Sequence, residues 1–174
     1  MQFYQRGLIL KKSIKNILPF VLMVSIFVGF LIFDLISKHI VEDNIELGTK
    51  KIIIKGFISF FTVHNFGAAW SIFSGKQIFL IVFTIIFLVL MIFYYIKEKS
   101  KSYLFNITYG FILAGTIGNL VDRIFLGYVR DFINLEFMDF PVFNIADICL
   151  TIGVGLFILY IIILTFKEKS GEKK

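Results

Sequence analysis

Four long runs of apolar residues dominate this chain of 174 residues. The hydrocarbon core of a bilayer is about 30 Å thick, and an α-helix needs about 20 apolar residues to cross it. The four runs have this length and lie at residues 17–36, 78–96, 103–121 and 143–166. The pattern therefore predicts an all-α integral membrane protein, in which residues 1–174 form a single domain with four transmembrane helices.

The connection between the first two runs, residues 37–76, has a different pattern. Residues 51–63 are rich in β-branched and aromatic side chains and are interrupted by Gly56, which is typical of short strands. Their apolar content is too high for a loop in water, so we expect a small β-sheet that rests on the membrane surface. In the last connection, residues 125–141, we expect the apolar piece 131–140 to lie near the interface as well. We further expect four aromatic side chains of the first connection beside a substrate cleft: Phe57, Phe60, Phe61 and Trp70.

The positions of the basic residues predict the topology. The net charge is +6, and most Lys and Arg residues precede the first run, occupy residues 97–101 or follow the last run. In a chain with four spans these places lie on one side, and an excess of Lys and Arg marks the cytoplasmic side. We therefore expect both termini in the cytoplasm and the sheet on the extracytoplasmic side. Because the basic residues gather at these three places rather than on one folded face, the net positive charge does not indicate a nucleic-acid partner.

Charged and amide side chains near the spans are candidate functional residues, because ionisable groups at membrane depth are costly and usually mark function. Asp34 and Lys38 are four residues apart and share one helical face, either as a structural ion pair or as electrostatic support for a site. Asn119, Asp122 and Arg123 share a face near the outer end of the third run. For these three we favour a polar cluster that fixes helix register around a site.

Two aspartates near the predicted outer side, Asp131 and Asp147, have the properties of a catalytic pair. Asn144 and Asp147 also have the spacing of a capping box, which gives Asp147 a structural alternative. Capping does not explain Asp131, which lies in apolar sequence. Two adjacent carboxylates share a proton, so one can activate a water molecule while the other polarises a carbonyl group. This is the chemistry of peptide hydrolysis without a metal or a covalent intermediate.

Other catalytic schemes have little support in the sequence. The motifs HExxH and GxSxG do not occur, and His39 and His64 alone make a weak set of metal ligands. We therefore expect no metal site and no cofactor. We expect His64 to form hydrogen bonds at the interface and Cys149, the single cysteine, to be a small buried side chain.

Five short segments occur in a characteristic order along the chain. They are residues 34–38 (DLISK), 64–70 (HNFGAAW), 115–123 (GTIGNLVDR), 129–133 (VRDFI) and 143–147 (FNIAD). Together they resemble the motifs of the lipoprotein signal peptidase family, also called signal peptidase II, from about residue 30 to residue 155.

The resemblance implies an aspartic endopeptidase of the bacterial cytoplasmic (inner) membrane, multi-pass, with its active site facing the extracytoplasmic side. Such an enzyme removes signal peptides from diacylglyceryl-modified prolipoproteins and cuts before the lipidated Cys. Membrane lipid and the inhibitor globomycin are the other expected partners. The resemblance makes Asp131 and Asp147 the catalytic pair. The expected supporting and substrate-binding residues are Asp34, Lys38, Asn65, Gly67, Asn119, Asp122, Arg123 and Asn144.

One departure from the family pattern concerns Arg130, which stands where an apolar residue is frequent. If this side chain points inward, it should lower the pKa of Asp131.

Two alternatives to a protease remain. A small proton or ion transporter would use an intramembrane carboxylate relay, but its charges should be spread across the bilayer, whereas these lie near the outer helix ends. A non-catalytic anchor or assembly protein would use the polar residues only to hold helices together. It predicts that Asp131→Asn and Asp147→Asn are harmless.

Overall fold

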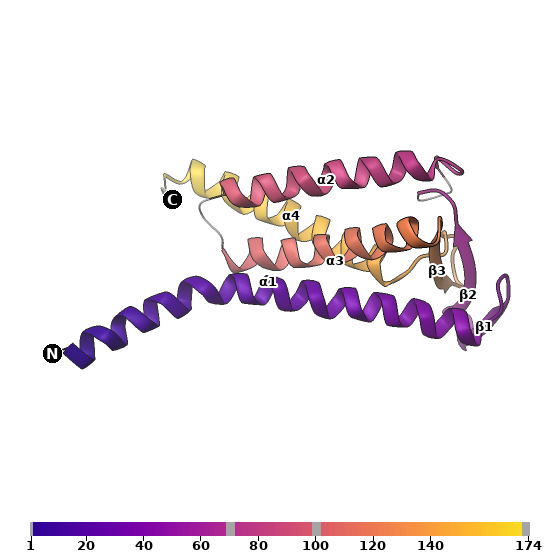
Figure 1. Ribbon diagram of the computed structural model, residues 1–174, viewed down its shortest axis with the longest axis horizontal. Coiled ribbons are helices and arrows are strands. Elements are labelled where there is room, and N and C mark those ends of the chain that lie inside the picture. Colours follow the sequence, from indigo (N-terminus) through magenta and orange to yellow (C-terminus); the bar gives the residue numbers. More distant parts are fainter. Residues whose placement is uncertain (1, 69–71, 99–101, 172–174) are drawn as a thin grey trace.

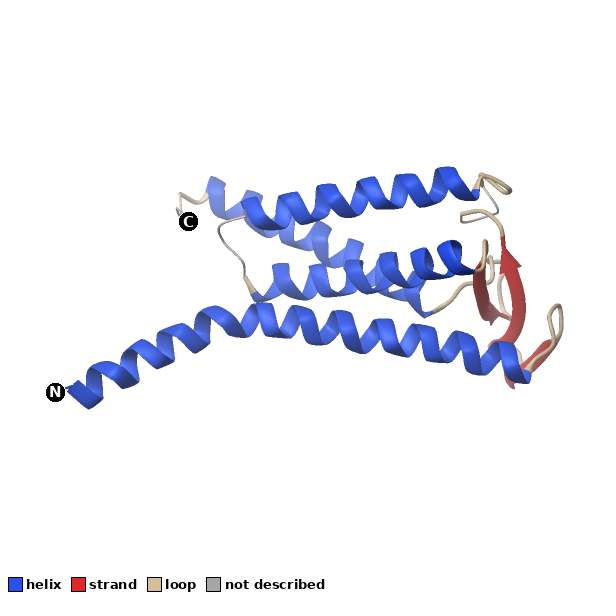
Figure 2. Cartoon of the chain, in the orientation of Figure 1, coloured by secondary structure: helices blue, strands red, loops and turns tan. Residues whose placement is uncertain are grey.

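In the computed structural model, four long helices run lengthwise and a three-stranded sheet covers one end of the bundle (Figure 1; Figure 2). The structure describes residues 2–68, 72–98 and 102–171, and the side chains of the first helix from residue 17 onward. The first helix begins and the last helix ends at the end of the bundle opposite the sheet (Figure 1). In chain order the elements are α1 (Gln2–Asn44), β1 (Lys50–Ile54), β2 (Ile58–Asn65), α2 (Gln77–Lys97), α3 (Tyr103–Phe125), β3 (Val129–Leu135) and α4 (Ile145–Lys169).

All four helices are long and apolar enough to cross a membrane, as the hydropathy pattern predicts. Helix α1 is longer than the predicted run at both ends, since it begins at Gln2 rather than near residue 17 and continues to Asn44 rather than stopping near residue 36. Beyond residue 36 the helix is amphipathic, so a uniformly apolar run no longer marks it. Val41 and the following Ile45 are buried against Phe132 and Ile133 of the sheet, and this packing extends α1 past the apolar run.

The sheet is antiparallel with the strand order β1-β2-β3, so its central strand is β2. The first two strands confirm the prediction for residues 51–63. The third strand comes from the last connection, which we expected only to lie near the interface. Val63 pairs with Asp131 and Asn65 pairs with Val129. This pairing joins segments more than 60 residues apart in the sequence, so local sequence patterns do not reveal it.

Helix α3 is the centre of the bundle, packed between α1 and α4 and buried over most of its length. Two glycines permit this packing. A Cβ atom on Gly115 would overlap the main-chain oxygen of Ala146 in α4, and one on Gly118 would lie 2.6 Å from a carboxylate oxygen of Asp34 in α1. The polar residues of α3 therefore face neighbouring helices at short range rather than lipid.

Replacing Gly115 with Ala should destabilise the protein by about 1–3 kcal/mol, because the added methyl group forces two helix backbones apart. Thermal unfolding in detergent micelles measures the effect. Gly155→Ala is the matched control, since that helical glycine has open space around it and alanine is the better helix former. Equal melting temperatures for the two variants would show that the α3–α4 contact tolerates a side chain.

Candidate active site

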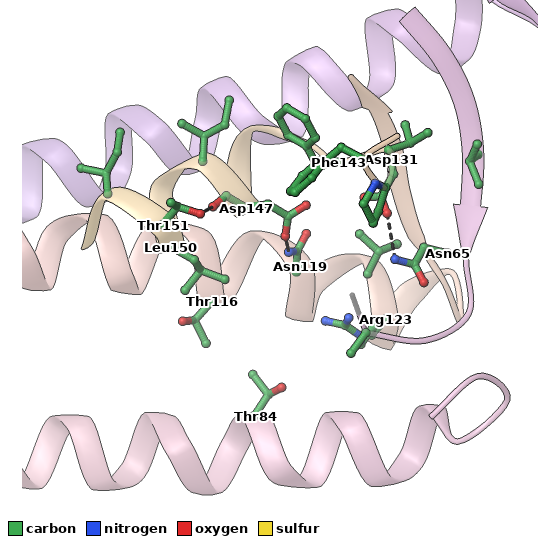
Figure 3. A pocket seen from close by; sticks show the side chains of 18 of the residues that line it. Asn65, Thr84, Thr116, Asn119, Arg123, Asp131, Phe143, Asp147, Leu150 and Thr151 are labelled. Atoms are coloured by element: carbon green, nitrogen blue, oxygen red, sulfur yellow. Dashed lines mark hydrogen bonds between the residues drawn. The ribbon is translucent and has the colours of Figure 1, made fainter. Parts of the chain in front are cut away.

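A cavity of about 920 Å³ lies below the sheet, between α2 on one side and α3 and α4 on the other (Figure 3). Its polar lining comes from several elements: Asn65 from β2, Asn119 and Arg123 from α3, Asp131 from β3 and Asp147 from α4. The apolar lining includes Phe83 and Phe87 of α2 and Phe143, which precedes α4. The fold thus brings both predicted aspartates to one cavity, although they lie on different elements.

Asp131 is 3% exposed, and two amide groups hold its carboxylate. Asn65 donates to one oxygen at 2.8 Å, and Asn144 donates to the other at 2.6 Å. Burial, together with the negative charge of Asp147, raises the pKa of Asp131 to about 7, while the two hydrogen bonds oppose the rise. The carboxyl group of Asp131 can therefore carry a proton near neutral pH.

Asp147 lies in the first turn of α4 and has two structural roles at once. Its Oδ2 accepts a hydrogen bond from the main-chain N–H of Asn144 at 3.0 Å, and the Asn144 side chain accepts one from the N–H of Asp147 at 3.0 Å. This is the capping box that the spacing predicts. Its Oδ1 accepts a hydrogen bond from Asn119 at 2.8 Å, and the residue also lines the cavity. Capping and a place in the site are therefore compatible.

Two asparagines link the aspartates to each other. The Nδ2 of Asn144 donates to Asp131 at 2.6 Å and to the Oδ1 of Asn119 at 3.0 Å, and the Nδ2 of Asn119 donates to Asp147. Lys38 also donates to the Oδ1 of Asn119, at 3.0 Å. Because this oxygen accepts from two donors, the amide nitrogen of Asn119 must face Asp147.

Behind the asparagines lies a buried ion network. Lys38 is 1% exposed and its Nζ is 2.8 Å from Asp34 and 3.3 Å from Asp122. Asp34 also accepts a hydrogen bond from the N–H of Ala146 at 2.8 Å, which ties α1 to the first turn of α4. The predicted pair of Asp34 and Lys38 therefore exists, and it supports the asparagines from outside the cavity.

The position of Arg130 corrects the expectation that it lowers the pKa of Asp131. Its guanidinium group lies 2.8 Å from Asp122 and 3.3 Å from Glu42, and its N–H also donates to Asp122 at 3.1 Å. Side chains on successive residues of a strand point to opposite faces, so Arg130 and Asp131 face different surroundings.

Glu42 also lies 3.2 Å from His64, which confirms the hydrogen-bonding role expected for that histidine.

Arg123, one of the three residues predicted to form a polar cluster on α3, lies in the cavity wall. Its Nη2 donates to the main-chain oxygen of Gly67 at 3.1 Å, and the Gly67 N–H donates to Asn65 at 2.8 Å. Gly67 thus contributes through its main chain, connecting Arg123 with the asparagine that holds Asp131.

The expectation that aromatic side chains of the first connection lie beside the cleft is wrong for the three of them that the structure describes. The lining of the cavity includes Val63 and Asn65 from β2, not Phe57, Phe60 or Phe61. Phe60 packs edge-on against Phe132 in the core below the sheet, and Phe57 stacks on the exposed Phe137. The fourth aromatic, Trp70, lies outside the described residues.

Sequence reasoning missed Glu42 and Thr116. Glu42 follows Lys38 by one helical turn, so the signal was present but lay beyond the predicted end of the helix. Thr116 lines the cavity one turn before Asn119, which is the spacing of one helical face.

Residues 26–163 match the protein family described as signal peptidase (SPase) II. The lipoprotein signal peptidase of Enterococcus faecalis (strain ATCC 700802 / V583) is 43% identical over 136 residues, which cover 78% of this chain and 84% of that protein. The lipoprotein signal peptidase of Lactobacillus johnsonii (strain CNCM I-12250 / La1 / NCC 533) is 39% identical over 147 residues, covering 84% of this chain and 94% of that protein. These matches confirm the family that the five sequence segments indicate.

Solved structures of similar proteins include a bacterial membrane enzyme determined by the in meso method at 2.3 Å resolution. It is 37% identical, with a TM-score of 0.77 over 87% of this chain and 92% of that chain. A second such structure, at 1.9 Å resolution, has a TM-score of 0.74 at 37% identity, over 80% of this chain and 91% of that one. The four-helix arrangement with its small sheet is therefore shared with these enzymes.

Proposed function

Since the chain belongs to the signal peptidase II family, a family of proteases, we propose that it removes signal peptides from prolipoproteins with Asp131 and Asp147 as the catalytic pair. One observation carries the proposal: two carboxylates from different elements, the buried Asp131 and the half-buried Asp147, line one cavity and are joined through Asn144 and Asn119. The remaining predicted residues hold this arrangement from outside or along the cavity wall.

The proposed reaction is the direct attack of water on the peptide carbonyl. One carboxylate takes a proton from the water, whose oxygen attacks the carbonyl carbon, while the protonated carboxyl group donates its proton to the carbonyl oxygen. The tetrahedral intermediate then collapses: the C–N bond breaks, the leaving nitrogen takes the proton held by the base, and one hydroxyl group of the intermediate returns its proton to the carboxylate that acted as the acid. No atom of the enzyme forms a covalent bond to the substrate.

The surroundings of the two groups favour Asp147 as the base and Asp131 as the acid. Asp147 lies at the N-terminus of α4, where the helix dipole stabilises a negative charge. Asp131 has no such position on β3, so no helix dipole stabilises its negative charge.

The assignment predicts that activity is lost as the pH rises through about 7. Above the raised pKa of Asp131 both carboxylates are ionised, so no proton is left for the carbonyl oxygen, and kcat/KM should fall about tenfold per pH unit. The Asn65→Ala variant loses a hydrogen bond that lowers this pKa, so its activity should decline at a higher pH than in the wild type. Asn134→Ala is the matched control, since Asn134 bonds to Ser59 and Glu136 in the sheet. If the pH dependence of kcat/KM in Asn65→Ala were the same as in the wild type, Asp131 would not be the acid.

The proposed setting is the outer face of the bacterial inner membrane. With the basic residues 97–101 and both termini in the cytoplasm, the sheet and the two aspartates lie at the outer surface. There the lipid chains of a diacylglyceryl-modified substrate can stay in the bilayer while its peptide bond meets water. We expect membrane lipid around the helices and the cyclic peptide globomycin as an inhibitor that competes for the cavity.

Purified protein in detergent or lipid should convert a diacylated prolipoprotein to the mature lipoprotein and a free signal peptide, which mass spectrometry resolves. The family assignment gives no support to a proton or ion transporter. Proton flux across proteoliposomes without cleavage would reverse that conclusion.

A further inference from the structure

Thr116 differs from the other threonines of the described helices. Thr84, Thr108, Thr151 and Thr165 each donate the hydroxyl group to the main-chain oxygen four residues earlier, at 2.7, 2.8, 2.8 and 3.0 Å. A helical threonine usually satisfies its hydroxyl in this way. Thr116 is only 6% exposed, yet its buried Oγ1 has no hydrogen-bond partner among the described residues. Buried polar groups in proteins are rarely left in this state.

The position of Thr116 connects this hydroxyl group to the cavity. Thr116 lines the cavity together with Asn119 and Arg123, which follow it at the i+3 and i+7 positions on one face of α3. In Figure 3, Thr116 points from α3 into the space that faces α2, opposite Thr84. Among the described residues of α2, Leu80 is the one that is buried.

The depth of Thr116 matches the path of a peptide that leads up to the cleaved bond. It lies one helical turn, about 5 Å, further into the bundle than Asn119. An extended chain covers that distance with one or two residues. A signal peptide whose N-terminal part points toward the cytoplasm would place the residues just before the scissile bond at this level.

Such residues need a hydrogen-bond donor from the enzyme. A peptide bond within a helix is shielded by its neighbours, so the substrate must be extended where it is cut. Extension leaves main-chain carbonyl groups without helical partners, and these cannot find water at membrane depth. We propose that the Thr116 hydroxyl donates a hydrogen bond to a main-chain carbonyl of the signal peptide, one or two residues before the cleaved bond. This inference rests on the proposed function and assigns Thr116 as a substrate-positioning residue.

The test compares two variants at this position in the cleavage of a diacylated prolipoprotein. Thr116→Val keeps the shape of the side chain but removes the donor, so KM should rise about tenfold while kcat stays within about twofold. Thr116→Ser keeps the hydroxyl group and should retain a KM near that of the wild type. Thr165→Val is the control, because Thr165 is exposed and bonded within α4, and it should leave both constants unchanged. Thermal unfolding checks that each variant is folded, and Thr116→Ala replaces the valine variant if that one is not.

A carbonyl group could also come from the ester bonds of the diacylglyceryl group, so a second substrate with ether-linked chains is compared. The penalty of Thr116→Val should persist with the ether substrate, since its peptide carbonyls are unchanged. A penalty that disappears with the ether substrate would assign the hydroxyl to the lipid ester and overturn the proposal. So would wild-type KM values for Thr116→Val, or a serine variant as impaired as the valine variant. If the wild type cleaves the substrate and Thr116→Val has the same KM as the wild type, the protease assignment stands and this inference alone fails.

Discussion

Asp131→Asn and Asp147→Asn should each abolish cleavage of a diacylated prolipoprotein, with a loss of about 1,000-fold or more. An asparagine has the shape of the aspartate, but it can neither take a proton from water nor give one to the carbonyl oxygen. Both oxygens of each carboxylate accept hydrogen bonds, so each asparagine keeps one acceptor and loses one bond, at a cost of about 1–3 kcal/mol, and thermal unfolding checks that the variants remain folded. Purified enzyme, a lipidated substrate and mass spectrometry of the products measure the effect.

Asp139→Asn is the matched control for these variants. Asp139 lies in the same connection as Asp131, but it is exposed and is not one of the residues that line the cavity, so its variant should cleave at the wild-type rate. If either cavity variant retained full activity while folded, that aspartate would not belong to the catalytic pair. If both did, the polar residues would serve only to hold the helices together.

Lys38→Met should have the second largest effect, a loss of about 3–5 kcal/mol in unfolding free energy together with most of the activity. The substitution leaves Asp34 buried without its counter-ion and removes a neighbouring positive charge from Asp122. It also removes one of the two donors that orient Asn119, so the contact of that amide with Asp147 is no longer fixed. Melting temperature and cleavage rate report the two effects separately.

A double variant separates the charge of Lys38 from its orienting role. Adding Asp34→Asn to Lys38→Met removes the unpaired carboxylate, so part of the lost stability should return while activity stays low. Lys55→Met is the control, since Lys55 is an exposed lysine next to β1. Wild-type activity in a folded Lys38→Met variant would show that Asn119 keeps its orientation without the lysine.

Much of the site could be predicted because its contacts leave local marks in the sequence. The pair Asp34 and Lys38 is visible from its four-residue spacing, and the capping box of Asn144 and Asp147 from its three-residue spacing. The family resemblance then assigned a role to Asn65, which a local pattern cannot do, because its partner Asp131 is 66 residues away.

The parts that could not be predicted depend on contacts between distant segments. Nothing near Arg130 indicates that it faces Asp122 and Glu42 rather than Asp131, because that depends on the pairing of β2 with β3. The unsatisfied hydroxyl of Thr116 is likewise invisible in the sequence, where it is one threonine among several. The aromatic residues of β2 were misplaced because composition does not tell which face of a strand meets a cavity.

The side chain of Asn144 has two roles, one in the helix and one in the site. The amide oxygen of Asn144 caps the first turn of α4, and its amide nitrogen donates hydrogen bonds to Asp131 and Asn119. The first turn of the last helix and the position of Asp131 therefore depend on the same side chain. For the proposed catalytic pair, we therefore expect a chain to become active only after its fourth helix has docked. Loosening of that first helical turn should lower the activity, because it would displace Asp147 and free Asp131 at the same time.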